Sequence, residues 1–425
     1  MAETGMTATD EMLLASSQRL GSTRMVQVLW TFPAHLTESD LNGLGQALDR
    51  SRLSRVPRRR LFPGGRRAWT ATTNAQPLTV TETSQDEQRA DWADEQIRRP
   101  LPESEGHLWR LSAHHGPQDT LLSLVVPHFR SDGHGLFAAL QDADSPADSS
   151  APRWWQDVRG TGEDLLAGLG GAAQWARELI RGAGQSEPVP PRDPIPQLSE
   201  PHRPQFFNTV WLEVDTTAWD EAAHRHGASP NSLFVEVAAN IIRALPERHE
   251  IVVGVPVSTR TSSHDRRANA LIVVPVPQPG GPPGHSNALD GRARLRTALQ
   301  GSDQRRVTVP PEPLWQLLPR PLAARLIAGG AQQTDVVASN FGQVAHPPLT
   351  VGPHQASRTA VRSMNVPGVV PAHARLTASL VLITDGSTSW LTATALPAAF
   401  GSRDGFAALV HDELAAWGLT STRWL

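Results

Sequence analysis

The sequence predicts an α/β protein of two lobes, each built from a layer of sheet and a layer of helices. The chain has 425 residues, which is enough for two ordinary domains. Seven prolines crowd the stretch between Gly184 and Pro204, where they forbid a helix and favour an extended connector. Strand-like and helix-like segments alternate on both sides of it. We therefore expect a first lobe over residues 1–184, a linker over 185–204 and a second lobe over 205–425.

In the first half, apolar runs and turn signals define the elements in order. Thr37 is a suitable N-cap, and acids follow it in the first turn of an expected helix. A Gly-Pro pair at 116–117 separates two strand-like runs, which predicts that they pair. The predicted strands are 24–31, 108–113 and 120–126. The predicted helices are 37–50, an apolar helix from near Gly135, and 162–182.

The second half repeats this order of elements without repeating the sequence. Ser229 predicts an N-cap, with Pro230 at the first helical position. Asp385-Gly386 is a strong hairpin signal. The predicted strands are 209–214, 251–257, 270–276, 379–384 and 387–396, and the predicted helices are 229–245 and 404–417. Residues 251–257 and 270–276 are almost wholly apolar, as expected of strands covered on both faces, and 275–284 is expected to be a surface loop.

Composition excludes several classes of function. The chain has no cysteine, which rules out disulfides, thiolate metal sites and a cysteine nucleophile. All 39 basic residues are arginine, so Schiff-base and P-loop lysine chemistry are excluded. A net charge of −3 gives no case for nucleic acid as a partner. No apolar run is long enough for a transmembrane segment, and residues 1–16 lack the pattern of a secretory signal, so we expect a cytoplasmic protein.

The stretch from Val125 to Gly135 holds the residues best suited to chemistry. His128 comes directly after a buried strand, and an imidazole with a pKa near neutral can take a proton from an alcohol or an amine. Asp132, four positions later, is suitably charged to fix the loop through an arginine. Gly133 is expected to adopt a backbone angle that other residues resist.

This stretch resembles the HHxxxDG active-site motif of the chloramphenicol acetyltransferase-like superfamily. The superfamily includes peptide-synthetase condensation domains, plant BAHD acyltransferases and the wax ester synthase/diacylglycerol acyltransferase family. The second histidine of the motif is the catalytic one, and it aligns with His128. Pro127 replaces the first histidine. That position is mainly a structural neighbour in the family, so the replacement bears on local geometry and substrate fit more than on chemistry.

A second stretch, from His114 to Thr120, keeps both histidines and the aspartate of the motif but ends in threonine instead of glycine. It lies in a predicted tight turn and no apolar helix follows it. We therefore interpret His114 and His115 as solvent-exposed turn residues.

Further resemblances occur in the expected order and favour the wax ester synthase/diacylglycerol acyltransferase branch or a relative. Their residues are His107-Leu108-Trp109 for the PLW element, Ser229 to Leu233 for the ND-type helix start with Ser232 in place of the aspartate, and Val255 to Arg260 for the PVSxR element, followed by Asn269. In such proteins the arginine pairs with the motif aspartate across the core. The resemblance therefore implies an architectural pair of Arg260 with Asp132.

Ser339-Asn340-Phe341-Gly342 resembles the SN-type loop of that branch and the DFGWG loop of condensation domains, which closes the tunnel near the active site. Asn340, with Ser339 and Asn269, is therefore a candidate for holding substrate or the tetrahedral oxyanion. An ordinary turn asparagine is an equally good interpretation of Asn340.

The resemblance implies two chloramphenicol acetyltransferase-like lobes with a tunnel between them and His128 at its middle. It also implies an acyl thioester donor on coenzyme A or on the phosphopantetheine of an acyl or peptidyl carrier protein, and a hydroxyl or amine acceptor. No bound cofactor, metal or acyl-enzyme is expected. The alternatives are a non-catalytic binding module, for which Pro127 is the best support, and a condensation or cyclisation enzyme of natural-product biosynthesis acting on carrier-bound intermediates.

Overall fold

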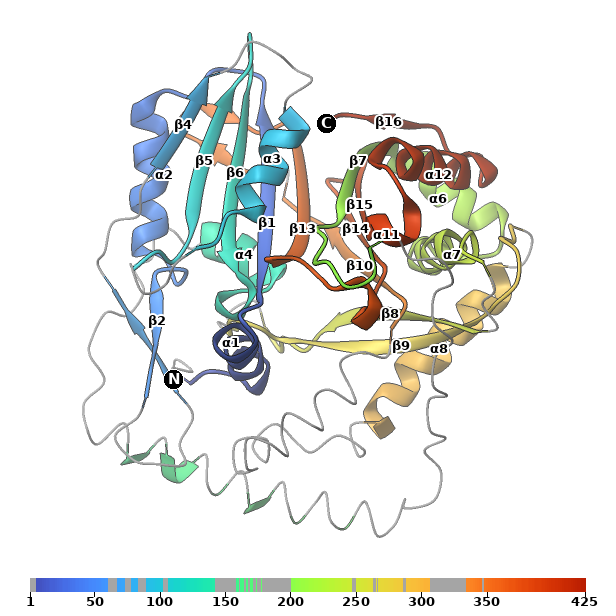
Figure 1. The fold of residues 1–425 in the computed structure, drawn as a ribbon, viewed down its shortest axis with the longest axis horizontal. Helices are drawn as coiled ribbons and strands as arrows, with labels where there is room; N and C mark the ends of the chain where they lie inside the picture. The colour runs from blue at the N-terminus through green and yellow to red at the C-terminus, as the bar shows by residue number, and fades with distance from the viewer. Residues whose placement is uncertain are drawn as a thin grey trace.

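The computed structural model shows two sheets side by side, each with its own helices (Figure 1). It describes residues 5–59, 67–72, 78–82, 89–101, 106–141, 200–246, 250–262, 265, 267–285, 288–305, 334–345 and 348–425, with ten further positions between 158 and 177. The predicted linker, except for 200–204, and most of the predicted helix over 162–182 lie outside the described residues. The linker boundaries therefore stay a prediction.

The sheet of the first lobe has the strand order β13-β1-β6-β5-β4. Its strands are β1 (Thr23–Phe32), β4 (Leu78–Glu82), β5 (Arg110–His115), β6 (Thr120–Pro127) and β13 (Arg358–Val366). Side chains of β1 alternate between two faces: Val28 packs with α2 (Glu38–Arg50) and α4 (Gly133–Gln141), and Leu29 packs with α3 (Arg89–Arg98). Strands β2 (Arg55–Arg58) and β3 (Ala68–Ala71) form a separate ribbon near helix α1 (Ala8–Leu20).

The sheet of the second lobe has the order β16-β7-β15-β14-β10-β8-β9. Its strands are β7 (Asn208–Asp215), β8 (Glu250–Ser258), β9 (Leu271–Pro279), β10 (Val336–Gln343), β14 (Ala378–Thr384), β15 (Thr388–Ala395) and β16 (Ser421–Arg423). Its helices are α6 (Thr216–Arg225), α7 (Pro230–Arg243), α8 (Ala288–Arg305) and α12 (Arg403–Ala416). Helices α6, α7 and α12 share one apolar core with strands of this sheet.

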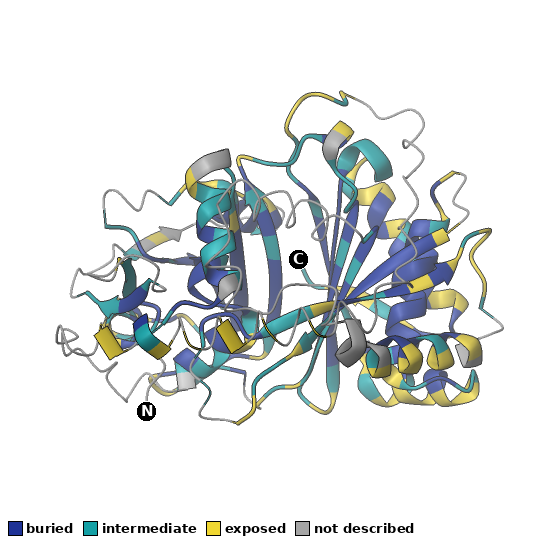
Figure 2. Cartoon of the chain, turned by 90° about the horizontal axis from the view of Figure 1, so that it is seen from below, coloured by how far each residue is buried: buried dark blue, intermediate teal, exposed yellow. Residues whose placement is uncertain are grey.

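The two lobes are not divided simply by sequence. Strand β13, from the C-terminal half of the chain, pairs along its whole length with β1 of the first lobe. Side chains of β14 and β15, namely Ile383 and Trp390, pack into the apolar core of the first lobe. Figure 2 shows the resulting interior, with buried strands in both lobes and exposed residues on the outer helices. Residues from the second half of the chain therefore form part of both the sheet and the core of the first lobe.

Most of the predicted elements are confirmed within one to three residues, including the helix α2 with its Thr37 cap and α7 with its Ser229 cap. The strand predicted over 270–276 is present as β9, but the expected burial of both its faces is wrong. This strand lies at the edge of the sheet, and its Val273 is 46% exposed rather than covered. Pro275 and Pro277 belong to the strand and not to a loop. An edge strand tolerates proline because its outer side needs no ladder N–H.

Several elements escaped prediction. Helix α1 was not predicted, although Thr7 and Asp10 form a capping box at its start. Helices α3, α6 and α8 and strands β10 and β13 were also missed. Their local patterns are weak, because their burial depends on segments far away in the sequence.

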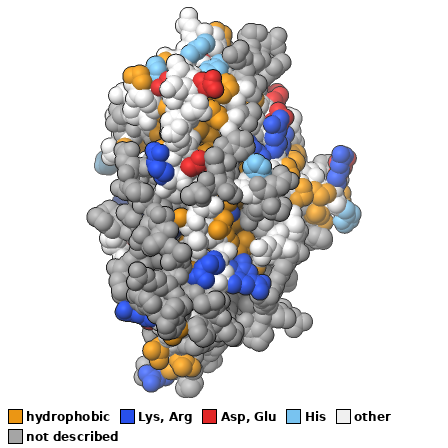
Figure 3. Space-filling view, turned by 90° about the vertical axis from the view of Figure 1, so that its left-hand side faces the viewer, with side chains coloured by type: hydrophobic (Ala, Val, Ile, Leu, Met, Phe, Trp, Pro, Cys, Tyr) orange, Lys and Arg blue, Asp and Glu red, His pale blue; other side chains and the backbone are white. Residues whose placement is uncertain are grey.

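On the face of the first lobe shown in Figure 3, arginine side chains lie in small separate groups, some of them beside acidic side chains. No helix within the described residues is long and apolar enough to cross a membrane.

Candidate active site

His128 lies where the central strand of the first lobe ends. Strand β6 continues to Pro127, and a single 3-10 turn, η3 (His128–Arg130), follows before α4 begins at Gly133. The backbone N–H of Ser131 closes this turn on the carbonyl of His128 at 3.2 Å. Pro127 has φ −60° and ψ 131°, so it extends the strand without distortion. The turn thus presents a half-buried imidazole at the end of the sheet.

Asn269 fixes the protonation state of the His128 ring nitrogens. The Asn269 amide nitrogen faces only acceptors: Asp10 Oδ1 at 2.8 Å, the His128 carbonyl at 2.9 Å and the Phe129 carbonyl at 3.3 Å. Its Oδ1 must therefore be the atom 3.0 Å from His128 Nδ1. Since that oxygen only accepts, His128 Nδ1 carries the proton. In the neutral ring Nε2 then holds a free lone pair, which is what a general base needs.

The surroundings of His128 favour its neutral form. Burial lowers the pKa of His128 below its usual 6.5, and the positive charge of Arg24 acts in the same direction. The backbone carbonyl of His128, the charge of Asp132 and the bond to Asn269 partly offset this. The ring is therefore neutral at neutral pH, with the proton on Nδ1 and a lone pair on Nε2 that can accept another.

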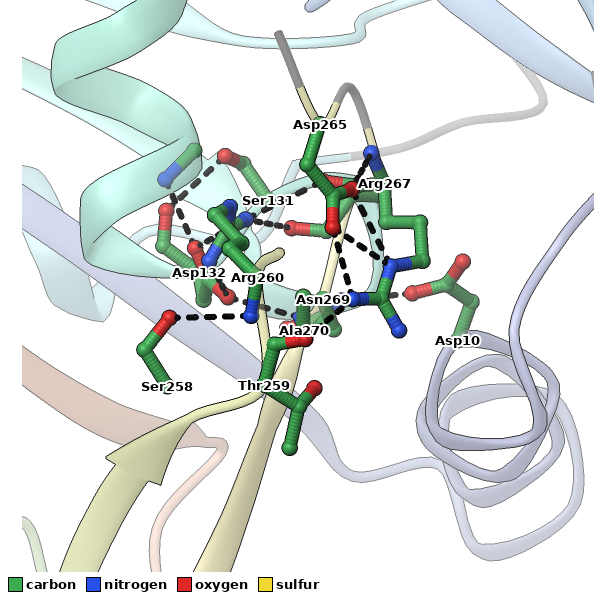
Figure 4. A network of polar contacts seen from close by, with 12 residues as sticks. Asp10, Ser131, Asp132, Ser258, Thr259, Arg260, Asp265, Arg267, Asn269 and Ala270 are labelled. Carbon is green, nitrogen blue, oxygen red and sulfur yellow. Dashed lines mark hydrogen bonds and ion pairs between the residues drawn. The ribbon is translucent and has the colours of Figure 1, made fainter. Parts of the chain in front are cut away.

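Asp132 and Arg260 form the predicted pair between the motif and the second lobe (Figure 4). Both guanidinium Nη atoms donate to the carboxylate at 2.9 Å, one to each oxygen. The Asp132 oxygens also accept from the backbone N–H groups of Gly135 at 2.6 Å and Ala270 at 2.9 Å. The aspartate therefore links the start of α4 to the loop between β8 and β9. This is the architectural contact that the resemblance implied.

The β8–β9 loop is itself held in shape. Thr259 donates its backbone N–H to Ala270 at 2.8 Å, which closes the base of the loop. Asp265 accepts from Arg267 within the loop, and this lowers the pKa of Asp265 to about 2. The loop thus delivers Asn269 from the second lobe to the His128 turn of the first. Figure 4 shows Asn269 and Ala270 at the end of this loop.

Gly133 is required for a reason other than the expected one. Its φ does not lie in the left-handed region, so the prediction of an unusual backbone angle is wrong. A Cβ atom at this position would instead lie 2.3 Å from two ring carbons of Phe341. The close approach of α4 to β10 therefore excludes a side chain here.

A pocket of about 310 Å³ opens beside the motif. It joins the first lobe to the second, with Asp132, Gly133, His134, Asn231, Val255, Pro256, Val257, Ser258, Arg260, Ala270, Leu271, Leu299, Ser339, Asn340 and Phe341 in its wall. The ring of His134 stacks on Phe341 with centroids 4.9 Å apart. His128 is not part of this wall, and a continuous tunnel through the molecule stays a prediction.

Ser339 and Asn340 lie in strand β10 and not in the loop that the sequence predicted. The strand is irregular between Asn340 and Gln343, where its register against β14 shifts. Asn340 Oδ1 accepts from the backbone N–H of Gly342 at 2.8 Å, so its amide nitrogen points towards Asn231 Oδ1, 3.4 Å away. Both asparagines line the pocket. Asn340 thus presents a hydrogen-bond donor there.

Asn269 does not fit the expected oxyanion role. It is 2% exposed, and its amide hydrogens face Asp10 and two backbone carbonyls. Its contact with His128 makes it an orienting residue, a role that the sequence pattern did not reveal. The signal that could have found Asp10, its partner, was the capping pattern at Thr7.

The other histidine pair also differs from its interpretation. His114 and His115 end strand β5, and His114 is 1% exposed, packed against Trp92 with ring centroids 5.2 Å apart. The description of both as solvent-exposed turn residues is wrong. Strand β5 extends two residues beyond the predicted end at Ala113, so both histidines belong to the sheet.

Comparison with solved structures shows condensation domains over almost the full length. The condensation domain of the Monacolin K polyketide synthase MokA has a TM-score of 0.62 and 12% identity, covering 98% of this chain and 97% of that one. The chain has the condensation-domain fold. The first condensation domain of the calcium-dependent antibiotic synthetase, with a substrate analogue, gives 0.62 and 16% over 97% and 95%. The starter condensation domain of rhizomide synthetase RzmA, with C8-CoA and Leu-SNAC, gives 0.60 and 15% over 97% and 94%.

These comparisons confirm the predicted architecture of two chloramphenicol acetyltransferase-like lobes. No protein-family model matches the sequence, and no curated protein is similar to it. The preference for the wax ester synthase/diacylglycerol acyltransferase branch therefore stays a prediction. Within the described part of the chain, no group of three or more His, Asp or Glu side chains could hold a metal ion.

Proposed function

We propose that this protein is an acyltransferase that moves an acyl group from a thioester to an amine or hydroxyl acceptor, with His128 as the general base. The observation that carries the proposal is the hydrogen bond from His128 Nδ1 to Asn269, which leaves the Nε2 lone pair free. The half-buried position of the ring and its lowered pKa support the same role.

In the proposed reaction, Nε2 of His128 takes the proton from the acceptor N–H or O–H as the acceptor attacks the thioester carbonyl carbon. A tetrahedral oxyanion forms, the C–S bond then breaks, and the thiolate takes the proton back from His128. Nδ1 keeps its proton throughout, and Asn269 Oδ1 stabilises the imidazolium that forms in between. The steps involve no oxidation or reduction, and no covalent enzyme intermediate is needed.

The pocket between α4, α7 and β10 is the proposed acceptor or acyl site. Its volume of about 310 Å³ is at the lower end for ligand pockets. Apolar side chains from β8 and β9 form one part of its wall, and amide and hydroxyl groups form another. Asn340, with Ser339 beside it, supplies the proposed donor to the oxyanion, because its amide nitrogen is directed along the pocket wall.

The donor is proposed to be acyl-coenzyme A or a thioester of an acyl or peptidyl carrier protein, in the cytoplasm. The RzmA domain was crystallised with C8-CoA and with Leu-SNAC, which are thioester-type ligands on the same fold. The resemblance of the motifs adds the hydroxyl acceptors of lipid acyl transfer to the amine acceptors of condensation domains. The donor panel must therefore include both carriers, and the acceptor panel both nucleophiles.

Thiol release measures this activity without a background from protein thiols, because the protein contains no cysteine. Acyl-coenzyme A and acyl carrier protein thioesters of different chain length are combined with alcohols and amines, and a thiol reagent reports the free thiol. His128→Ala should abolish acceptor-dependent release while the protein stays folded. The exposed His202→Ala serves as the matched control and should retain activity. Equal turnover of His128→Ala and the unmodified protein would reject the mechanism.

A second candidate, a non-catalytic module that binds an acyl chain or carrier protein, rests on Pro127 in place of the first motif histidine. The structure shows Pro127 paired with Met25 at the end of β6, so the exchange leaves the His128 turn in place. Binding of a thioester without thiol release, for every donor and acceptor pair, would support this candidate.

A further inference from the structure

The first turn of helix α1 is linked to the motif by a buried carboxylate. Asp10 is fully buried, and its Oδ1 accepts from the amide nitrogen of Asn269 at 2.8 Å. Its Oδ2 accepts from the backbone N–H of Thr7 at 2.7 Å as part of the capping box. The helix N-terminus stabilises a negative charge at this position. The carboxylate therefore links the first turn of α1, through Oδ2, to Asn269, through Oδ1.

Three segments that are remote in sequence meet in this chain of hydrogen bonds. Asp10 comes from α1, Asn269 from the loop between β8 and β9, and His128 from the end of β6. Figure 4 shows Asp10 reaching from α1 towards Asn269, next to the Asp132–Arg260 pair. The general base is therefore oriented by a residue of the second lobe, which is in turn held by the N-terminal helix.

We propose that Asp10 is a positioning residue for the transfer reaction, which acts on His128 through Asn269. A negative charge behind the amide holds its NH₂ group towards α1 and strengthens its oxygen as an acceptor, since linked hydrogen bonds polarise one another. Asn269 then keeps the proton on Nδ1 and stabilises the imidazolium. The arrangement does through an amide what the aspartate of a serine-protease triad does directly.

Asp10 has two tasks, the capping of α1 and the support of Asn269, and a variant of Thr7 is the control for the first. Thr7 Oγ1 accepts from the backbone N–H of Asp10 at 3.1 Å and caps the same turn. Thr7→Val weakens the cap but leaves the carboxylate facing Asn269, whereas Asp10→Asn removes the charge at almost constant size. If Asp10 only stabilised the helix, both variants would act alike.

The catalytic part of this inference rests on the proposed function. Asp10→Asn should lower kcat by about 10- to 100-fold with little change in KM, as loss of an orienting partner does. The acid limb of its pH–rate profile should move to lower pH, because the imidazolium loses the support of the carboxylate. Thr7→Val should lower the melting temperature with kcat and the pH profile close to those of the unmodified protein.

A readout that needs no turnover distinguishes failure of this inference from failure of the proposed function. ¹⁵N NMR of histidine-labelled protein, with the His128 signals assigned by their loss in His128→Ala, reports which ring nitrogen carries the proton. We expect protonated Nδ1 in the unmodified protein and in Thr7→Val, and a mixture of tautomers in Asp10→Asn. If Asp10→Asn does not fold, Asn269→Ala examines the same link with α1 unchanged and should also give a mixture. An unaltered Nδ1–H tautomer in the folded variants, or equal kinetic effects of Asp10→Asn and Thr7→Val, would overturn the assignment.

Discussion

Removal of Arg260 tests the connection between the motif and the second lobe. The guanidinium donates to both oxygens of Asp132, and the two side chains are 14% and 3% exposed. In Arg260→Ala the carboxylate stays buried without its counter-ion, although it still accepts from the backbone N–H groups of Gly135 and Ala270. Breaking a buried pair from one side costs about 3 to 5 kcal/mol. Because the two backbone donors remain, we expect the free energy of unfolding to fall by about 3 kcal/mol.

Thermal and urea unfolding provide the assay. For unfolding units of one lobe or of the whole chain, this loss corresponds to a decrease in melting temperature of roughly 3 to 7 °C. Arg203→Ala is the matched control, since Arg203 and Glu200 are 75% and 60% exposed and 3.5 Å apart. An exposed pair of this kind contributes less than about 1 kcal/mol.

A double-mutant cycle with Asp132→Ala makes the test specific to the pair. The double variant should be less destabilised than the sum of the two single variants, because each single change already breaks the same contact. An unchanged melting temperature in Arg260→Ala, or full additivity in the cycle, would refute the reasoning.

Three more outcomes are expected. Gly133→Ala should cost about 1 to 3 kcal/mol, because its Cβ meets the Phe341 ring, while the helical Gly43→Ala, with open space around it, should be neutral or stabilising in urea unfolding. The midpoint of the acid limb of kcat/KM should lie below pH 6.5, because burial lowers the pKa of His128 and keeps its basic form populated; a midpoint above pH 6.5 would contradict this. Arg362→Leu should lower the unfolding free energy by about 3 kcal/mol, since this buried side chain bonds to groups of both lobes; calorimetry that shows no loss would oppose it.

Local signals predicted the elements whose pattern is complete within a short segment. Strand β6 is apolar from Leu121 to Pro127 apart from Ser123. The β14–β15 hairpin has Asp385-Gly386 at its turn, and Gly386 does adopt a positive φ of 102°. Helix α7 begins at the predicted cap of Ser229. The position of His128 after a buried strand followed from the same reasoning. Each of these depends on neighbours within a few residues.

Other features depended on contacts that the sequence does not display. Strand β13 joins the first sheet although it lies more than 300 residues from its partner β1, because only the folded chain supplies a free edge there. Strand β9 looked buried on both faces since it is apolar, yet its side chains alternate between buried and exposed, so one face lies open. Gly133 was expected to need an unusual angle, but the approach of Phe341 is what requires it. Packing partners, not local propensity, decide these cases.

By itself the sequence determined the α/β class, most strands and capped helices, the exclusion of cysteine and lysine chemistry, and the single histidine best placed to act as a base. Only the tertiary structure decided how that histidine is held. The tautomer of His128 depends on Asn269, which lies 141 positions away along the chain. The orientation of Asn269 depends in turn on Asp10, which is 259 positions from it. A hydrogen bond acts over about 3 Å of space regardless of sequence separation, so such a relay exists only once both lobes and helix α1 are packed together.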